Sequence, residues 1–244
     1  MQYGVSMELG LEGRVAIVTA ASRGLGRATA EALSEEGVRT VVVARTRDAL
    51  EELVASLPAP AIAVTGDLTD PELPARLVEL ALREFGRLDV LVANNGGPPR
   101  GAALDVSDSE ILAAIEHNLL VPVRLVREAV KPMRAAGWGR VCIIASGSVK
   151  QPMADLALSN TARPGLWGWA KTAANEVAGD GITVNLVCPG HHATARTAQI
   201  GRMTNGPTGD PKDFGKVVTF LCSTHAKFVT GTAMLVDGGN VKGL

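Results

Sequence analysis

The sequence is poor in tyrosine and in cysteine, and each shortage excludes a class of function. Its 244 residues include one tyrosine, Tyr3, which lies ahead of the first apolar run, so a mechanism that needs a tyrosine in the body of the fold is excluded. The three cysteines, Cys142, Cys188 and Cys222, are too few and too scattered for a disulfide framework or a zinc site. We therefore expect no metal centre, and we interpret the cysteines as small hydrophobic residues in or beside buried strands.

Excess charge and long apolar runs are lacking as well. Lys and Arg number 24 against 25 Asp and Glu, which argues against a basic surface for nucleic acid. No apolar run reaches the roughly 18 residues of a membrane span, and the N-terminus lacks the basic and apolar stretches of an export signal. We expect a soluble, cytoplasmic protein with no nucleic-acid or membrane partner. Its length favours one domain, residues 13–244, after a leader of residues 1–12.

Short apolar runs rich in Val, Ile, Leu and Ala alternate with helical segments along the chain. The runs lack polar alternation, which is typical of strands buried on both faces of a parallel sheet. They predict an α/β fold, a Rossmann-type doubly wound parallel sheet of about seven strands in a single domain. The predicted strands are residues 15–19, 40–44, 61–65, 90–93, 141–145, 183–188 and 233–236.

The segments between the strands, among them residues 26–36, 71–85, 107–136 and 166–178, are rich in Ala, Leu, Glu and Arg and favour helices. Residues 191–212 break the alternation because they are polar, contain Gly and Pro, and show no period. A loop of this length is more often functional than accidental, so we interpret it as a lid over a site. The alternative is a surface loop without such a role.

A glycine-containing turn links the first predicted strand to the first predicted helix. Glycines let a backbone approach a pyrophosphate closely, and the first turn of a helix supplies free N–H groups. The position between strand and helix is the context that supports such a motif, so we expect a dinucleotide cofactor there. The residues of this loop are Thr19, Ser22, Arg23, Gly24, Leu25 and Gly26.

Two arginines favour NADP(H) over NAD(H) as that cofactor. Arg45 ends the second predicted strand, where an acidic residue would hold a free ribose hydroxyl and an arginine suits a 2′-phosphate. Arg23 supplies a second cation to the same group. If both arginines are only solvated surface residues, NAD(H) remains an option.

In order and spacing these motifs resemble the short-chain dehydrogenase/reductase family, and specifically its ketoacyl-reductase-like branch, over residues 13–239. The family's T-G-x-x-x-G-x-G motif is matched with Ala20 in place of its first glycine. The resemblance implies assembly into a homodimer or homotetramer, and further cofactor contacts. These contacts are Asp67 and Leu68 after the third strand, Asn94 and Gly96 after the fourth, and Pro189, Gly190 and Thr194 of a P-G-x-x-x-T motif.

The catalytic set of the family, an Asn, a Ser and a Tyr-x-x-x-Lys pair, is only partly matched. Asn118 corresponds to the Asn, and Ser146 to the Ser that hydrogen-bonds the substrate oxygen. Where the resemblance places the tyrosine stands Ser159, and where it places the lysine stands Arg163. The motif is therefore Ser-x-x-x-Arg, in which Arg163 can still contact the cofactor ribose or polarise an oxygen.

This substitution removes the family's proton donor, because a serine hydroxyl is a far weaker acid than a phenol and an arginine keeps its proton. Losing a general acid typically costs about 10²–10⁴ in rate, which slows hydride transfer without abolishing it. His191, His192 or Lys150 is an alternative donor. For the two histidines we favour a turn with both rings facing solvent, and we interpret His117 as a packing or dimer-surface residue.

Pro164 directly follows the altered pair, and proline is disfavoured inside a helix but tolerated in its first turn. We therefore expect the helix to begin near Pro164, with Asn160 or Thr161 as its cap and residues 153–162 as a loop over the site. Trp167 and Trp169, two positions apart, cannot share one helix face, so we expect at least one to pack outward, on the surface through which the family associates.

Two functions remain open. The first, which we favour, is an NADP(H)-binding oxidoreductase acting on a small-molecule carbonyl or alcohol with a non-standard proton donor. The second is a catalytically impaired nucleotide-binding sensor or assembly protein, which would keep the nucleotide motifs beside a dismantled proton-donor pair.

Overall fold

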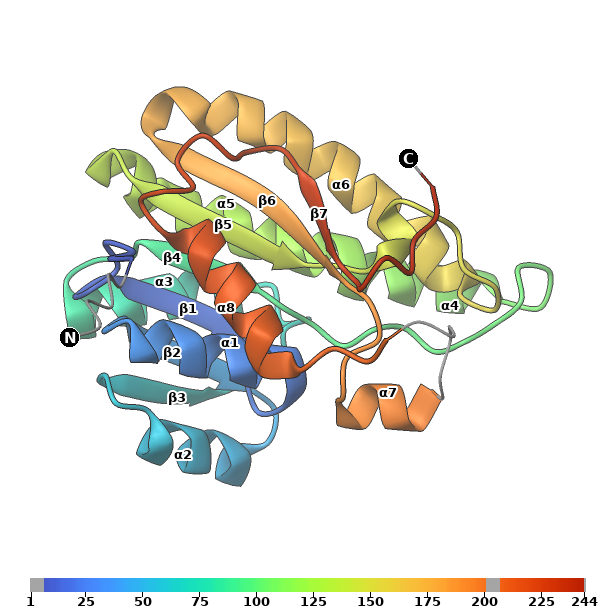
Figure 1. Cartoon of the computed structure of the whole chain (residues 1–244), viewed down its shortest axis with the longest axis horizontal. Coiled ribbons are helices and arrows are strands. Elements are labelled where there is room, and N and C mark those ends of the chain that lie inside the picture. Colours follow the sequence, from blue (N-terminus) through green and yellow to red (C-terminus); the bar gives the residue numbers. More distant parts are fainter. Residues whose placement is uncertain (1–6, 201–206, 244) are drawn as a thin grey trace, which may run out of the picture.

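The computed structural model describes residues 7–200 and 207–243, in which one parallel sheet lies between two layers of helices (Figure 1). Seven strands form the sheet in this part of the chain, in the order β3-β2-β1-β4-β5-β6-β7, so the predicted doubly wound α/β fold is confirmed. Tyr3 lies outside the described residues. The strands are β1 (Val15–Thr19), β2 (Arg39–Ala44), β3 (Ala61–Thr65), β4 (Val90–Ala93), β5 (Gly139–Ile144), β6 (Ile182–Pro189) and β7 (Ala233–Val236).

The strand boundaries agree with the prediction to within two residues. β1, β3, β4 and β7 coincide with the predicted runs, while β2, β5 and β6 differ by one or two residues at an end. Every residue of β1 and β4 is buried, which explains why their runs show no polar alternation.

The helices connect successive strands. No helix among the described residues has the length and apolarity required to cross a membrane. They are α1 (Gly24–Glu35), α2 (Arg47–Ser56), α3 (Leu73–Phe85), α4 (Asp108–Ile115), the π-helical turn η1 (Glu116–Leu120), α5 (Val121–Ala136), the 3₁₀ turns η2 (Gly147–Val149) and η3 (Ala178–Asp180), α6 (Ala157–Val177), α7 (Ala195–Ile200) and α8 (Pro211–Cys222).

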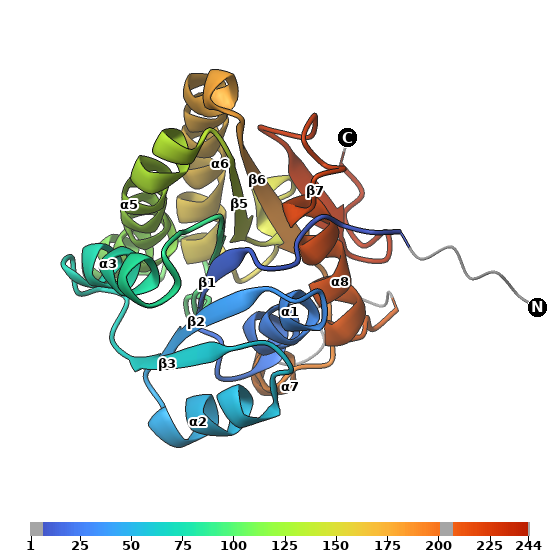
Figure 2. The same cartoon turned by 90° about the vertical axis from the view of Figure 1, so that its left-hand side faces the viewer.

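Two apolar cores lie on opposite faces of the sheet (Figure 2). Helices α3, α5 and α6 cover one face with side chains such as Leu77 and Leu166, and α1 and α8 cover the other with Leu33 and Val218. Helices α1 and α8 approach so closely that a Cβ at Gly215 would lie 2.5 Å from the carbonyl oxygen of Ala28. The glycine therefore sets the distance between these two helices.

Strand order reverses direction between β1 and β4. The chain moves outward from β1 to β2 and β3, and then returns to place β4 on the other side of β1. In such sheets a crevice opens at this switch point, outside the carboxyl ends of the strands, and ligands bind there. The fold thus locates a candidate site before any side chain is considered.

The helical segment predicted over residues 107–136 is interrupted by η1. A capping box, in which Ser107 and Glu110 exchange side-chain-to-backbone hydrogen bonds, starts α4. The backbone then widens into the π-helical turn that contains Asn118 before α5 continues to Gly137 in the left-handed conformation. Single π turns of this kind are frequent at functional sites.

The prediction that the sixth helix begins near Pro164 is wrong. α6 begins at Ala157, and Pro164 lies inside it. The face of α6 that carries Leu158, Ala162 and Leu166 is buried, and this packing offsets the hydrogen bond that the proline cannot donate. Asn160 is not a cap; its side chain donates to the carbonyl of Met153 and accepts from the Met153 N–H, closing the turn before the helix.

The predicted lid, residues 191–212, is not wholly irregular. It contains α7 and the first residues of α8, and residues 201–206 lie outside the described part of the chain. Of the predicted leader, residues 1–6 also lie outside the described part, while Leu11 is buried in the core on the face of the sheet that α1 and α8 cover.

Candidate cofactor and substrate site

The switch point is held together by side chains from both strands that border it. The Thr19 hydroxyl donates to the Asn94 carbonyl at 2.6 Å and accepts from the Asn94 N–H at 2.9 Å. The Asn94 side-chain amide donates to the carbonyl of Ala20 at 3.3 Å. Both predicted cofactor residues, Thr19 and Asn94, thus fix the edge of the crevice and leave the loop after β1 in a defined position.

The loop after β1 has the backbone of a phosphate-binding turn. Ala20 and Gly24 adopt positive φ angles of 47° and 61°. A Cβ at Gly26 would lie 2.5 Å from the Ala20 carbonyl oxygen, so only glycine lets α1 pack this closely. Arg23 is the N-cap of α1 and provides no side-chain hydrogen bond, so the first-turn N–H groups have no side-chain cap. Ser22, Leu25 and Gly24 are partly exposed beside them.

Two exposed arginines lie where the adenine ribose of a dinucleotide would be expected. Arg45 follows β2 and Arg23 lies in the loop after β1, and neither side chain makes a hydrogen bond or an ion pair with the described residues. Asp67, after β3, is nearby, and hydrogen bonds from the Thr69 N–H and hydroxyl hold the pKa of its carboxyl below its usual range. Leu68 is partly buried against the core.

The opposite end of the crevice is formed by the segments that follow β4 and β6. Gly96 is exposed, and its neighbour Asn95 donates from its side chain to the carbonyl of His117 in η1. A Cβ at Gly190 would lie 2.5 Å from the Cα of Asp237, so only glycine fits after Pro189. Thr194 lies at the start of the lid.

The lid lies close to the turn that follows β1. A Cβ at Gly24 would lie 3.5 Å from Cγ2 of Thr194, and Arg196 donates to the carbonyl of Pro98 at 2.6 Å. The lid therefore bridges the crevice between the segments that follow β1 and β4.

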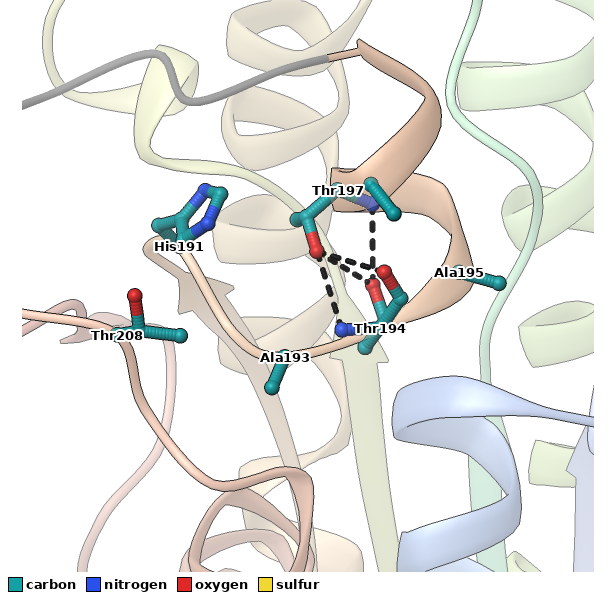
Figure 3. A pocket seen from close by; sticks show the side chains of 7 residues that line it. His191, Ala193, Thr194, Ala195, Thr197 and Thr208 are labelled. Carbon is teal, nitrogen blue, oxygen red and sulfur yellow. Dashed lines mark hydrogen bonds between the residues drawn. The ribbon is translucent and has the colours of Figure 1, made fainter.

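A cavity of about 570 Å³ lies between the outgoing and returning arms of the lid (Figure 3). His191 and Ala193 line it from the first arm, Thr197 from α7, and Thr208 from the second arm. Thr194 and Thr197 exchange hydrogen bonds that close the first turn of α7 at its wall.

Three of the four predicted catalytic residues lie near the carboxyl end of β5. The Ser146 hydroxyl accepts from the N–H of Ser148 at 3.2 Å and is partly exposed. The hydroxyls of Ser148 and Ser159 are 2.9 Å apart and both residues are buried. Sequence reasoning missed Ser148, for which no motif gives a signal, and the Ser148 contact ties Ser159 into the interior.

Arg163 occupies the next turn of α6 and is 4% exposed. Its Nη1 donates to the carbonyl of Ile144, the last residue of β5, at 3.3 Å. Burial lowers the pKa of the guanidinium to about 10, so Arg163 stays charged near neutral pH.

Asn118 is buried in η1, which packs against α6. Its side-chain amide donates to the carbonyl of Ala114 at 3.2 Å, while its Oδ1 has no hydrogen-bond partner among the described residues. A buried acceptor without a partner costs free energy, so Oδ1 is a position where a donor from a ligand would be stabilised.

The alternative proton donors differ in position. His192 is buried, with its ring 5.1 Å from that of Phe214 and its Nδ1 at the carbonyl of Gly190, so the expectation that both rings face solvent is wrong for it. Its burial follows from the packing of the lid onto α8, which local sequence does not reveal. His191 is partly exposed and lines the cavity, and His117 is exposed on η1.

Lys150 and Trp167 face one another at the edge of α6. The Lys150 ammonium lies 4.0 Å from the centre of the Trp167 ring, a cation–π contact. Trp167 and Trp169 are both partly buried against the core, so neither projects fully from the helix. The cysteines are buried and form no disulfide, and Cys222 lies at the end of α8, with its sulfur 3.7 Å from that of Cys142.

Comparison with known proteins places this geometry among oxidoreductases. The model of a family described as enoyl-(acyl carrier protein) reductase matches residues 19–240. The 3-oxoacyl-(acyl carrier protein) reductase of Vibrio cholerae is 33% identical over 242 residues, which cover 95% of this chain and 98% of the relative. Human dehydrogenase/reductase SDR family member 4 is 30% identical, covering 94% and 88%.

A solved structure is similar over almost the whole chain. The L-sorbose reductase of Gluconobacter frateurii, crystallised with NADPH and L-sorbose, superimposes with a TM-score of 0.91 at 31% identity, covering 98% of this chain and 100% of the reductase. The similarity thus extends across the sheet, the crevice and the lid.

Proposed function

This chain belongs to the short-chain dehydrogenase/reductase family, whose members are NAD(P)-dependent oxidoreductases, and we propose that it binds NADP(H) and acts on a small carbonyl or alcohol substrate. The observation that carries the proposal is the first turn of α1, which has no side-chain cap and lies at the switch point of the sheet. In this position its N–H groups would bind a pyrophosphate.

The residues around the crevice fit a dinucleotide phosphate. Gly24 supplies the positive φ of the turn and Gly26 lets α1 pack closely against it, which would leave the first-turn N–H groups open to a pyrophosphate. The side chains of Arg23 and Arg45, which have no partner among the described residues, would bind a 2′-phosphate. Relatives support this choice, since the L-sorbose reductase was crystallised with NADPH. NADP(H), when bound, supplies the hydride or accepts it.

The chain's own residues orient the substrate rather than deliver a proton. Ser146, partly exposed at the end of β5, would donate a hydrogen bond to the reacting oxygen. Arg163 contributes a fixed positive charge in a site of low dielectric constant, where charge stabilisation is strong. Ser159 is held by Ser148 in the interior, so it does not replace the phenol of the family.

One observation favours the second candidate function, a nucleotide-binding sensor or assembly protein. The buried pair Ser148–Ser159 lies where the family keeps its proton donor, and neither hydroxyl titrates near neutral pH. Such a site would bind a nucleotide without turnover.

Binding and turnover assays separate the two candidates. NADPH and NADH are titrated by calorimetry, and consumption of the tighter cofactor is then followed with β-keto esters, quinones and aldehydes. NADPH binding with turnover is the expected result. Binding without turnover on any of these substrates would favour the sensor, and failure to bind either nucleotide would refute both functions.

We propose further that the protein is a homodimer or homotetramer, as the family resemblance implies. Light scattering coupled to gel filtration measures the mass, and a monomer at micromolar concentration would contradict the proposal.

A further inference from the structure

Arg163 is a buried cation whose charge no acidic side chain in the described part of the chain compensates. Of its three guanidinium nitrogens only Nη1 has a partner among the described residues, the carbonyl of Ile144. Nε is buried and makes no hydrogen bond. A buried charge without a counter-charge is unfavourable, and an anionic ligand would supply the counter-charge that the described residues lack.

The guanidinium lies at the carboxyl ends of β5 and β6. Ile144 lies two residues before Ser146 and pairs in register with Val187 of β6. The next residue of β6, Cys188, interacts electrostatically with Arg163. This is the edge of the sheet at which the substrate of an open α/β fold binds. The phosphate-binding turn, by contrast, follows β1 on the other side of β4.

No neighbouring group supplies the missing negative charge. Burial raises the pKa of the Cys188 thiol to about 11, so it is neutral near pH 7. Asp237, which also interacts with Cys188, accepts hydrogen bonds from the N–H groups of Gly239 and Val241. Two further positive charges are in the neighbourhood, since Lys150 interacts with Cys188, and Arg196 with Arg163 itself.

We infer that the site takes an anionic substrate, a small oxo acid or the matching hydroxy acid, whose carboxylate pairs with Arg163 while its reacting oxygen lies at Ser146. The planar donors of a guanidinium match a carboxylate in two parallel hydrogen bonds, which a lysine in the same place cannot provide. Lys150 adds a second positive charge near the same end of the site. The inference rests on the proposed function and specifies its substrate class.

Matched pairs of acid and ester test the charge alone. Acetoacetate is compared with methyl acetoacetate, and pyruvate with methyl pyruvate, by calorimetric titration into the protein saturated with NADP⁺, which holds no hydride to transfer. We expect each acid to bind at least tenfold more tightly than its ester, as a charge-assisted pair provides. Equal affinity, or tighter binding of the esters, overturns the inference.

Variants assign the preference to Arg163. Arg163→Gln should remove the preference for the acids, measured as the ratio of ester Kd to acid Kd, while Arg163→Lys should retain part of this preference. Arg83→Gln, which removes an exposed arginine on α3, is the matched control and should leave the preference unchanged. Circular dichroism checks the fold of each protein, and if Arg163→Gln does not fold, Lys150→Gln replaces it, with an expected two- to fivefold loss of the preference.

The outcomes distinguish this inference from the proposed function. If NADP⁺ does not bind, the proposed function fails, and the same acids and esters are titrated into the protein alone, where a preference for acids still supports an anion site. If Arg163→Gln weakens NADP⁺ binding while the wild-type protein binds acid and ester equally, Arg163 contacts the cofactor ribose instead, and the inference is overturned.

Discussion

Ala20 provides a quantitative test of how the turn after β1 is built. Its φ of 47° places a residue with a side chain in the left-handed region, at the position where the family has glycine. Such a conformation costs an L-residue about 1–2 kcal/mol, whereas glycine adopts it freely. Replacement by glycine also increases the entropy of the unfolded chain, which lowers stability by about 0.4–1 kcal/mol.

The strain that glycine relieves, less the entropy that it adds to the unfolded chain, gives the expected change in the free energy of unfolding. Ala20→Gly should raise the free energy of unfolding by about 0.5–1 kcal/mol, which corresponds to a rise in Tm of about 1–4 °C for a protein of this size. Urea unfolding followed by tryptophan fluorescence measures the change, and the slope of free energy against urea concentration should stay constant.

Ala21→Gly is the matched control. Ala21 is fully buried and has a negative φ, so glycine there relieves no strain and removes a buried methyl group. This control should lower the free energy of unfolding by about 1 kcal/mol or more. If Ala20→Gly lowers the free energy of unfolding as much as Ala21→Gly does, backbone strain at Ala20 does not destabilise the wild-type protein and the reasoning is refuted.

Three further predictions concern the cofactor, the substrate oxygen and the lid. Arg45→Ala should weaken NADPH binding by about 10-fold or more and NADH binding by less than about twofold, and equal losses in calorimetry would argue against a 2′-phosphate contact. Ser146→Ala should lower kcat/KM about 10²-fold with an unchanged Kd for NADPH; an unchanged kcat/KM would contradict its role. Burial lowers the pKa of His192, so the folded state favours the neutral ring, and its contribution to stability is present above about pH 6.5 and declines as pH falls through the lower pKa of the folded state. The free energy of unfolding should therefore fall less between pH 7.5 and pH 5 for His192→Asn than for the wild-type protein. Identical decreases in the two proteins would exclude His192 as the cause.

The sheet could be predicted from sequence because its signal is local. A strand covered by helices on both faces must be apolar at successive positions, and β1 and β4 satisfy this over their whole length. The turn after β1 could also be predicted from the sequence. Gly24 has a positive φ, and a side chain at Gly26 would clash with the Ala20 carbonyl, so both positions favour glycine.

Features that depend on tertiary contacts were not predictable in this way. Local propensity ends a helix before Pro164, yet the buried face of α6 on both sides of the proline keeps it helical. No residue pattern distinguishes the π-helical turn around Asn118 from the α-helices on either side of it. The contact between Ser148 and Ser159 joins residues from η2 and α6 that only the fold brings together.

That contact shows why the two replacements in the catalytic motif belong together. The Ser148 contact holds the Ser159 hydroxyl in the interior, where it cannot take over the role of a phenol. Without a phenol, a lysine has no neighbouring pKa to lower, and a guanidinium can occupy its place as a fixed charge. Because burial lowers the pKa of Arg163 only to about 10, the guanidinium would pair with an anionic group without transferring its proton near pH 7. The proton that completes a reduction must then come from solvent or from a group outside this pair, so neither residue 159 nor residue 163 should impose a titration on the rate between about pH 6 and 9.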